Sequence, residues 1–498
     1  MNPTHAPERG RRYHMSGVGG SGMAPMAQLV ASLGAEVTGS DRNHDRGIVL
    51  PWFEHLRTAG VRLIPQDGSG VHPGLTAVVH SSAVEPGNPD IRRAEELGVP
   101  RIPRGPFLAR LANPSRTLAV AGTSGKSTIT AMTAHVLVAT GLDPTFLGGG
   151  AAVALEGALP PGSLRVGGGE WFVLETDESD GSVAEFAPAV ATIANLSRDH
   201  KEPEVVAGYF AALLAGTREA AVLNAGDPGL ATLRPPPALH VLYTAVEGDE
   251  AWTRPGLVAR DLRLSPDQVE FDLSGTRVRV PFPGRATVEN ALLAVASAVL
   301  AGVSVPDAAA ALEGFAGVRR RFERIGAAGG VEVFDDFAHN PVKIRAAIEA
   351  LRPRGALWLY YQPHGYGPTR FFRDELIEAF RGALRPGDRL LLAPIYDAGG
   401  TANRNIRSED LAEPLARAGV QATVVADRAA AADAIARGVR PGDRVVVMGA
   451  RDDTLPLYAR SLLGVLSVRT PAGAGERRGA YPRQEEPRRR GLGGAGRG

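Results

Sequence analysis

One segment constrains the fold more than any other, because it predicts a strand, a tight glycine turn and a helix in direct succession. Thr117–Ala121 is an apolar run, Gly122–Thr128 is the turn, and Ser127–Thr140 has a helical pattern. Glycines let the backbone wrap closely around an anion, and the helix N-terminus directs N–H groups and the positive end of its dipole toward it. Lys126 is then placed to reach the terminal phosphates of a nucleotide, and Ser127 to ligate Mg²⁺. The segment therefore predicts a nucleoside triphosphate site in an α/β fold.

Lysine is rare in this chain, which strengthens that interpretation. Of the 55 basic residues only Lys126, Lys201 and Lys343 are lysines. A coding bias toward arginine explains most of this composition, and a lysine that survives it can mark a place where a compact ammonium serves better than a planar guanidinium. The usual pattern G-x-x-x-x-G-K-[ST] would have glycine where Val120 stands. A glycine-rich turn with a solvated lysine is the alternative, and the strand–turn–helix context favours the phosphate site. The predicted ATP-binding residues of the turn are Gly122, Thr123, Ser124, Gly125, Lys126, Ser127 and Thr128.

Two further strands end in residues suited to a metal ion. Trp171–Leu174 runs into Glu175–Asp180, which holds four carboxylates in six residues, and Ala189–Ala194 is followed by Asn195 and then by His200. Mg²⁺ prefers oxygen ligands, and ligands gather at the carboxyl ends of strands in open α/β sheets. Solvated carboxylates on an exposed turn are the alternative. The apolar strands that deliver them favour a metal site.

A second glycine turn opens the chain. The strand Arg11–Ser16 leads into Gly17-x-Gly19-x-x-Gly22 and the helix Met23–Leu33, and an acidic residue follows about twenty residues later. This spacing is typical of dinucleotide binding and would suit NAD. The same turn can hold the diphosphate of a sugar nucleotide, and a dehydrogenase has no obvious use for the second, ATP-type turn. We therefore favour a UDP-type substrate over NAD, with the binding residues Gly17, Gly19, Gly20, Ser21, Gly22, Asp41, Ser81 and Ser82.

The chain is too long for one hydrophobic core, at 498 residues. Strand and helix patterns alternate, which predicts α/β domains with largely parallel sheets. We expect three domains, 1–113, 114–317 and 318–468, with a disordered Arg/Gly-rich tail at 469–498. Leu111–Ser115 is interpreted as a linker. The remaining predicted strands are Glu36–Gly39, Thr76–His80, Ala220–Leu223, Val331–Phe334, Ala356–Tyr361, Arg389–Ala393, Gln421–Val425 and Arg444–Met448, and a helix is predicted at Asn290–Leu300.

Composition excludes several classes of function. There are no cysteines, hence no disulfides, thiolate nucleophiles or Cys-ligated zinc sites. No apolar stretch approaches the ~20 residues that span a bilayer, and the polar N-terminus lacks a signal-peptide pattern. The formal charge of +1 gives no reason to expect nucleic-acid or membrane binding. We expect a cytoplasmic enzyme, and the sequence does not indicate its oligomeric state.

Taken together, the motifs resemble those of the Mur ligases, over roughly residues 12–465. The resemblance is to the branch that adds L-alanine to UDP-N-acetylmuramate and to its murein-peptide-recycling relative. The motifs that carry it, in order, are His14–Met23, Ala121–Thr128, Glu175–Asp180, Val318–Phe322, Asp335–Pro341, Gln362–His364 and Met448–Ala450. The resemblance implies a Rossmann-like N-terminal domain, a P-loop ATPase-like central domain and a Rossmann-like C-terminal domain.

The resemblance also implies an activity. Such an enzyme is an ATP-dependent, C–N bond-forming ligase of peptidoglycan biosynthesis that joins an amino acid to UDP-N-acetylmuramate through an acyl phosphate. It implies Ser127, Glu175 and His200 as ligands of Mg²⁺. It also implies catalytic roles for Lys126, Glu175, His200, Asp336 and His339, nucleotide contacts for Asn290, Arg320 and Arg321, and amino-acid contacts for Asn340, Lys343, His364 and Arg370.

The departures from the family pattern gather around the expected amino-acid pocket. Phe337 stands for Tyr, Asn340 for His, Lys343 for an acidic residue and Gly365 for Arg. In the nucleotide site Ser124 stands for His, Ser127 for Thr, and Ala286 and Thr287 for a His-Asn pair. The loss of an arginine clamp suggests that the carboxylate of the incoming substrate is held differently, with Arg370 as a candidate replacement. A different amino acid or a peptide as acceptor, and a catalytically silent regulator, remain alternatives. The intact set of Lys126, Ser127, Glu175 and His200 argues against the regulator.

Overall fold

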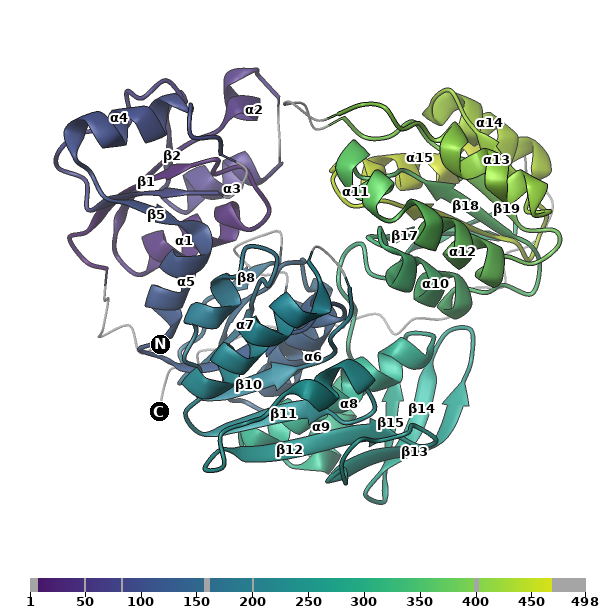
Figure 1. The fold of residues 1–498 in the computed structure, drawn as a ribbon, viewed down its shortest axis with the longest axis horizontal. Coiled ribbons are helices and arrows are strands. Elements are labelled where there is room, and N and C mark those ends of the chain that lie inside the picture. Colours follow the sequence, from purple (N-terminus) through teal and green to yellow (C-terminus); the bar gives the residue numbers. More distant parts are fainter. Residues whose placement is uncertain are drawn as a thin grey trace, which may run out of the picture.

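The computed structural model describes residues 8–48, 51–81, 84–155, 162–198, 201–397 and 403–467. It has three α/β domains, each built on its own mostly parallel sheet. Figure 1 shows them as three layered units that follow one another along the chain, coloured purple to blue, teal, and green to yellow. Within the described residues, no helix is long and apolar enough to cross a membrane.

The N-terminal sheet has the order β3-β2-β1-β4-β5 and is parallel throughout. Tyr13 and Met15 of β1 are buried in the apolar core, whereas His14 and Ser16 lie on the opposite face in a polar network. One face of this sheet thus packs in the main apolar core, and the other combines the buried polar network with a smaller apolar cluster that includes Val78 of β4. The elements are β1 (Arg12–Ser16), α1 (Met23–Ser32), β2 (Glu36–Ser40), α2 (Arg42–Asp45), α3 (Pro51–Thr58), β3 (Arg62–Leu63), β4 (Ala77–His80), α4 (Pro89–Leu97), β5 (Arg101–Pro103) and α5 (Arg104–Ala112).

The central sheet has the order β15-β14-β13-β12-β11-β10-β6-β9-β7-β8. The strands from β13 to β7 pair in parallel, and the pairs β13–β14, β14–β15 and β7–β8 are antiparallel. Helices α6 and α8 pack on it beside one another. The elements are β6 (Arg116–Ala121), α6 (Lys126–Ala139), β7 (Thr145–Leu147), η1 (Val153–Leu155), β8 (Leu164–Arg165), β9 (Trp171–Glu175), η2 (Ser182–Glu185), β10 (Val190–Ile193), α7 (Pro203–Gly216), β11 (Ala220–Asn224), η3 (Pro228–Thr232), β12 (His240–Val246), β13 (Leu257–Leu264), β14 (Val269–Leu273), β15 (Thr276–Val280), α8 (Arg285–Leu300) and α9 (Val305–Glu313).

The C-terminal sheet has the order β16-β17-β21-β18-β19-β20, with only β16 antiparallel to its neighbour among the described strands. Its apolar cores lie on both faces, as a parallel sheet covered by helices requires. The elements are β16 (Glu323–Ala328), β17 (Val331–Asp336), α10 (Pro341–Ala350), β18 (Leu357–Tyr361), α11 (Tyr366–Phe371), α12 (Arg373–Ala383), β19 (Arg389–Leu392), α13 (Glu409–Arg417), β20 (Ala422–Val424), α14 (Arg428–Gly438), β21 (Arg444–Met448) and α15 (Leu455–Ser467).

The expected linker at Leu111–Ser115 is wrong in its first part. Leu111 and Ala112 are the buried last residues of α5. Asn113 follows the helix, and its side chain donates to the Glu185 carbonyl and accepts from the Ala187 amide. The helix continues through Leu111 and Ala112 because these apolar residues are buried. The N-terminal and central domains are therefore joined at a packed helix end, which the Asn113 side chain ties to the central domain. The expected tail at 469–498 lies outside the described residues.

Candidate functional site

The turn after β6 requires glycine at two positions. Gly122 has φ +138° and Gly125 has φ +82°, and such positive values strain residues that carry a side chain. A Cβ at Gly125 would lie 2.4 Å from Asn290 Oδ1, and one at Gly122 would lie 3.0 Å from the Ala194 Cβ. The turn is thus closely packed against α8 and the end of β10. Its backbone can approach a bound anion closely because no side chain intervenes.

Asn195, just after β10, fixes the shape of the turn. Its Oδ1 accepts from the Ser124 amide at 2.8 Å and from Thr123 Oγ1 at 2.9 Å, and its Nδ2 donates to the Ser124 carbonyl at 3.2 Å. Ser197 Oγ lies 2.9 Å from Thr123 Oγ1. In contrast, Ser124 Oγ is buried and has no hydrogen-bond partner within the described residues. The turn is therefore held from one side and leaves a polar atom available on the other.

Lys126, the first residue of α6, lies between the turn and the carboxylates after β9. Its Nζ donates to the Gly122 carbonyl at 2.7 Å and lies 2.8 Å from Glu178 Oε2, and only 14% and 5% of the two side chains are exposed. Burial alone would lower the pKa of the Lys126 ammonium, but the carboxylates of Glu178 and Glu175 raise it above its usual value. Lys126 is therefore a buried, charged group at the mouth of the turn.

The predicted metal ligands are described only in part. Ser127 is buried in the first turn of α6, and Glu175 at the end of β9 accepts from the Gly149 amide at 2.9 Å. Arg321 Nη2 lies 3.5 Å from Ser127 Oγ. His200 lies outside the described residues, and within them no cluster of three histidines or carboxylates suited to a metal is found. Ser127 and Glu175 nevertheless share one cavity and supply the hard oxygen donors that Mg²⁺ prefers.

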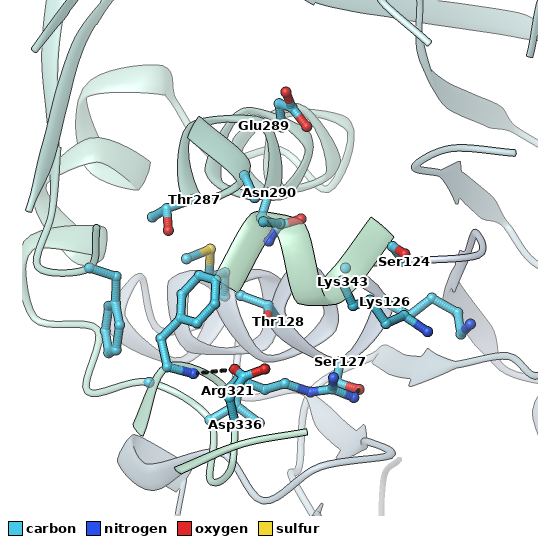
Figure 2. Close-up of a pocket in the computed structure, with 18 of the residues that line it drawn as sticks. Ser124, Lys126, Ser127, Thr128, Thr287, Glu289, Asn290, Arg321, Asp336 and Lys343 are labelled. Atoms are coloured by element: carbon cyan, nitrogen blue, oxygen red, sulfur yellow. Dashed lines mark hydrogen bonds between the residues drawn. The ribbon is translucent and has the colours of Figure 1, made fainter. Parts of the chain in front are cut away.

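That cavity has a volume of about 250 Å³ and is lined by residues of both the central and the C-terminal domain. Figure 2 shows Lys126, Ser127 and Arg321 on one side, with Thr287 and Asn290 of α8 across from them. Other lining residues are Thr123, Ser124, Gly125, Thr128, Glu175, Glu289, Asp336 and Lys343. Most of the predicted nucleotide residues therefore surround a single space, into which the C-terminal domain brings Asp336 and Lys343.

Asp336, the last residue of β17, is held rigidly. Its Oδ2 accepts from the Phe322 amide and its Oδ1 from the Ala338 amide, both at 2.8 Å. Burial raises the pKa of this carboxyl, and the two amides and Arg321 oppose that rise. Its neighbour Asp335 is fully buried 3.4 Å from Arg320 Nε, and burial raises its pKa to about 7. The end of β17 is therefore a buried carboxylate pair that faces two arginines.

The expected amino-acid residues divide into two groups. The rings of His339 and His364 are 4.7 Å apart in an edge-to-face contact, and Asn340 caps α10 by accepting from the Lys343 amide at 2.9 Å. Lys343 also lines the cavity. Arg370 does not line it: its Nη2 donates to the Asn403 carbonyl at 2.7 Å and to Asn405 Oδ1 at 2.6 Å. The structure thus brings three of the four expected amino-acid residues together, beside the predicted catalytic His339, and places Arg370 on an exposed part of α11.

The first glycine turn is fixed by the predicted Asp41. Its Oδ2 accepts from the Gly19 amide at 2.9 Å and its Oδ1 from the Asn43 amide at 2.8 Å. Trp52 Nε1 donates to the Gly19 carbonyl at 2.7 Å. Gly17 has φ +78°, and Gly20, Ser21 and Gly22 complete the turn into α1. Ser81 follows β4 directly, and Ser82 lies outside the described residues.

The sequence did not reveal the roles of two residues of the site, Glu178 and Asn195. Glu178 was one of four carboxylates with no feature to single it out, and only the structure shows that it pairs with Lys126. Asn195 was noted only as the residue after a strand, although its position was the available signal. A polar residue at the carboxyl end of the strand beside β6 can reach the turn, because β10 and β6 are neighbours.

Comparison with known proteins matches all three domains to one family. Residues 12–116 match the Mur ligase family catalytic domain, residues 120–298 the Mur ligase middle domain, and residues 320–451 the Mur ligase glutamate ligase domain. UDP-N-acetylmuramate–L-alanine ligase of Mycobacterium marinum is 35% identical over 480 residues, which cover 91% of this chain and 95% of that protein.

Solved structures agree on the fold. UDP-N-acetylmuramate-alanine ligase MurC from Thermotoga maritima has a TM-score of 0.73 at 24% identity, covering 91% of this chain and 98% of its own. A murein peptide ligase from Psychrobacter arcticus has a TM-score of 0.65 at 24% identity, covering 93% and 100%. With family models along the three domains and a 35% identical relative over nearly its whole length, this chain belongs to the Mur ligase family.

Proposed function

We propose that this chain is an ATP-dependent ligase of peptidoglycan synthesis that joins L-alanine to UDP-N-acetylmuramate in the cytoplasm. The observation that carries the proposal is the buried Lys126 in its glycine turn, opening on a cavity that the C-terminal domain completes with Asp336 and Lys343. The 35% identical relatives that bear the name of this ligase support the choice of reaction. In this proposal residues 1–113 bind the sugar nucleotide, 114–317 bind ATP and 318–468 bind the amino acid.

The chemistry joins two steps. The carboxylate of UDP-N-acetylmuramate attacks the γ-phosphorus of ATP, the bond to the β-γ bridging oxygen breaks, and ADP leaves. The amine of the amino acid then attacks the acyl phosphate, loses a proton, and expels phosphate as the amide forms. Positioning and charge neutralisation do most of the work in phosphoryl transfer, and Lys126 and Arg321 supply positive charge on the same side of the cavity.

The residues present suit a bound Mg²⁺. Ser127 Oγ and the Glu175 carboxylate are hard oxygen donors on the cavity wall, and His200 follows the neighbouring strand β10 in the sequence. When bound there, the ion would neutralise charge on the phosphate oxygens. Glu175 is oriented by the Gly149 amide, and Lys126 is held in its charged form by the carboxylates after β9. These two residues are therefore set before any ligand arrives.

Phosphate release from the purified protein tests the proposal. ATP, Mg²⁺ and UDP-N-acetylmuramate are supplied with each of the twenty amino acids in turn, and L-alanine is expected to give the fastest release. Another amino acid as the best substrate would overturn the choice of L-alanine and leave the ligase reaction standing. If no amino acid stimulates release above the level of its omission, the ligase proposal fails.

A further inference from the structure

The centre of the C-terminal sheet brings three loops together. Strands β17, β21 and β18 are neighbours and run parallel, so the loops after them lie at one edge. The first carries His339, the second Arg451 and the third His364 and Gly365. The 4.7 Å contact between the His339 and His364 rings shows that the outer two loops meet in front of the middle one. Arg451 therefore emerges beside the residues expected to contact the amino acid.

Gly365 leaves room for the Arg451 head group. Gly365 is buried and has φ +142°, which few residues other than glycine adopt. A Cβ built on it would lie 3.4 Å from Arg451 Nη1, and this is the nearest atom outside its chain neighbours. The guanidinium thus lies against the backbone at the position where the family pattern has an arginine. It reaches that position from a different strand.

The other arginines near this edge are already engaged. Arg320 donates to the Gly449 carbonyl at 2.6 Å and to the Ala450 carbonyl at 3.3 Å, and Arg321 points to Ser127. Arg370 is held by Asn403 and Asn405. Arg451 is exposed and makes no hydrogen bond or ion pair in the part of the chain that the structure describes. Its guanidinium can therefore donate two parallel hydrogen bonds to an incoming anion such as a carboxylate.

We infer that Arg451 binds the α-carboxylate of the incoming amino acid and thereby selects acceptors that carry one. This inference rests on the proposed function, because only that function supplies an amino acid at this edge. The carboxylate is the one charged group of L-alanine other than the reacting amine, and a guanidinium binds it through two parallel hydrogen bonds. Holding the carboxylate fixes the position from which the amine attacks.

The test compares L-alanine with L-alaninamide as acceptors at saturating ATP, Mg²⁺ and UDP-N-acetylmuramate. The amide keeps the amine and replaces the carboxylate by a neutral group. The wild-type enzyme should prefer L-alanine in kcat/KM, and Arg451→Ala should raise the KM for L-alanine about 10- to 100-fold while kcat changes little. In that variant the preference for L-alanine over L-alaninamide should disappear. Because the same two compounds are compared on each protein, their difference in amine basicity cancels.

Arg404→Ala is the matched control, since it removes an exposed arginine that is already paired with Asp397, in the loop after the neighbouring strand β19. It should keep the KM and the preference of the wild type. An unchanged preference in Arg451→Ala overturns the inference, even if kcat falls, because a structural role alone would lower the rate with both acceptors. A wild-type enzyme without activity on any amino acid would instead refute the proposed function. Should another amino acid prove the best substrate, it and its carboxamide replace the alanine pair.

Discussion

The two glycine turns share a frame, strand then turn then helix, yet each is joined to a different kind of buried pair. Near the central turn, Lys126 lines the cavity and lies 2.8 Å from the buried Glu178. In the N-terminal domain, His14 Nε2 lies 3.2 Å from Asp90 Oδ2 and neither side chain is exposed. Lys126 can therefore exchange Glu178 for a ligand in the cavity. The His14–Asp90 pair is fully buried and has no such access.

The surroundings of the pairs explain the difference. Asp90 also accepts from Ser16 Oγ at 2.9 Å, from Ser40 Oγ and from the Gly68 amide at 3.0 Å. Its carboxylate therefore joins α4 to β1, to β2 and to the loop after β3. Glu178 has Lys126 as its charged partner, and Lys126 reaches the turn through a single carbonyl. A sealed pair stabilises a frame, and an accessible pair holds a charge ready for a ligand.

Lys126→Ala should produce the largest effect and gives the sharpest test of the comparison. Loss of a positioned charge at the phosphates should lower kcat/KM for ATP about 10³-fold, equivalent to about 4 kcal/mol in the barrier. Steady-state phosphate release measures it. The thermal shift that UDP-N-acetylmuramate induces should persist in this variant, because the N-terminal turn does not depend on Lys126. Activity within a factor of ten of the wild type would show that the central turn is not the phosphate site.

Asp90→Asn should act on stability and not on the chemical step. Breaking a buried, multiply bonded carboxylate costs about 3 kcal/mol, which denaturant unfolding at pH 7 measures. Burial raises the pKa of Asp90, but the hydrogen bond and charge of His14 and the two serine hydroxyls lower it below its usual value overall. A carboxyl whose pKa is lowered by folding stabilises the folded state at pH values above its pKa in the unfolded chain. The difference in unfolding free energy between wild type and variant should therefore be complete at pH 7 and should shrink only below about pH 4.

The exposed Asp67, which is only part of a surface turn, provides the matched control for that prediction. Asp67→Asn should leave the unfolding midpoint at pH 7 unchanged. Equal stability of Asp90→Asn and the wild type at pH 7 would mean that the network beneath the N-terminal sheet contributes nothing.

Asp41→Ala should weaken the binding of the sugar nucleotide about 10-fold. The carboxylate accepts from the Gly19 and Asn43 amides and so holds the turn in shape. Without it the ligand must order the turn on binding, and this ordering lowers the affinity. Calorimetric titration with UDP-N-acetylmuramate measures the change, and the KM for ATP should stay constant. An unchanged affinity would show that the first turn is fixed without Asp41, and that the analogy between the two turns extends only to their glycines.

The sequence predicts the frames of both turns well because they rest on local signals. Strand Thr117–Ala121 and helix Ser127–Thr140 were expected, and the structure has β6 at Arg116–Ala121 and α6 at Lys126–Ala139. It does not predict which distant groups meet at the site. The pairing of Lys126 with Glu178 and the approach of Arg451 to Gly365 depend on strand order and loop shape, which no periodicity encodes. The antiparallel hairpins β13 to β15 were not predicted at all.

Arg104→Ala should have the smallest effect, although it cuts the ion pair that links the two turn-bearing domains. Arg104 Nη2 lies 2.9 Å from Asp177 Oδ2, next to Glu178, but 39% of the Asp177 side chain is exposed, so solvent screens the pair. Helix α5 is also held by packing, since a Cβ at Gly105 would lie 2.2 Å from Ser182. The variant should lower the free energy of unfolding by under ~1 kcal/mol. The KM for the sugar nucleotide should rise only about two-fold. A double-mutant cycle with Asp177→Ala isolates the pair, and a coupling energy well above 1 kcal/mol would make this contact, and not the packing of α5, the main link between the domains.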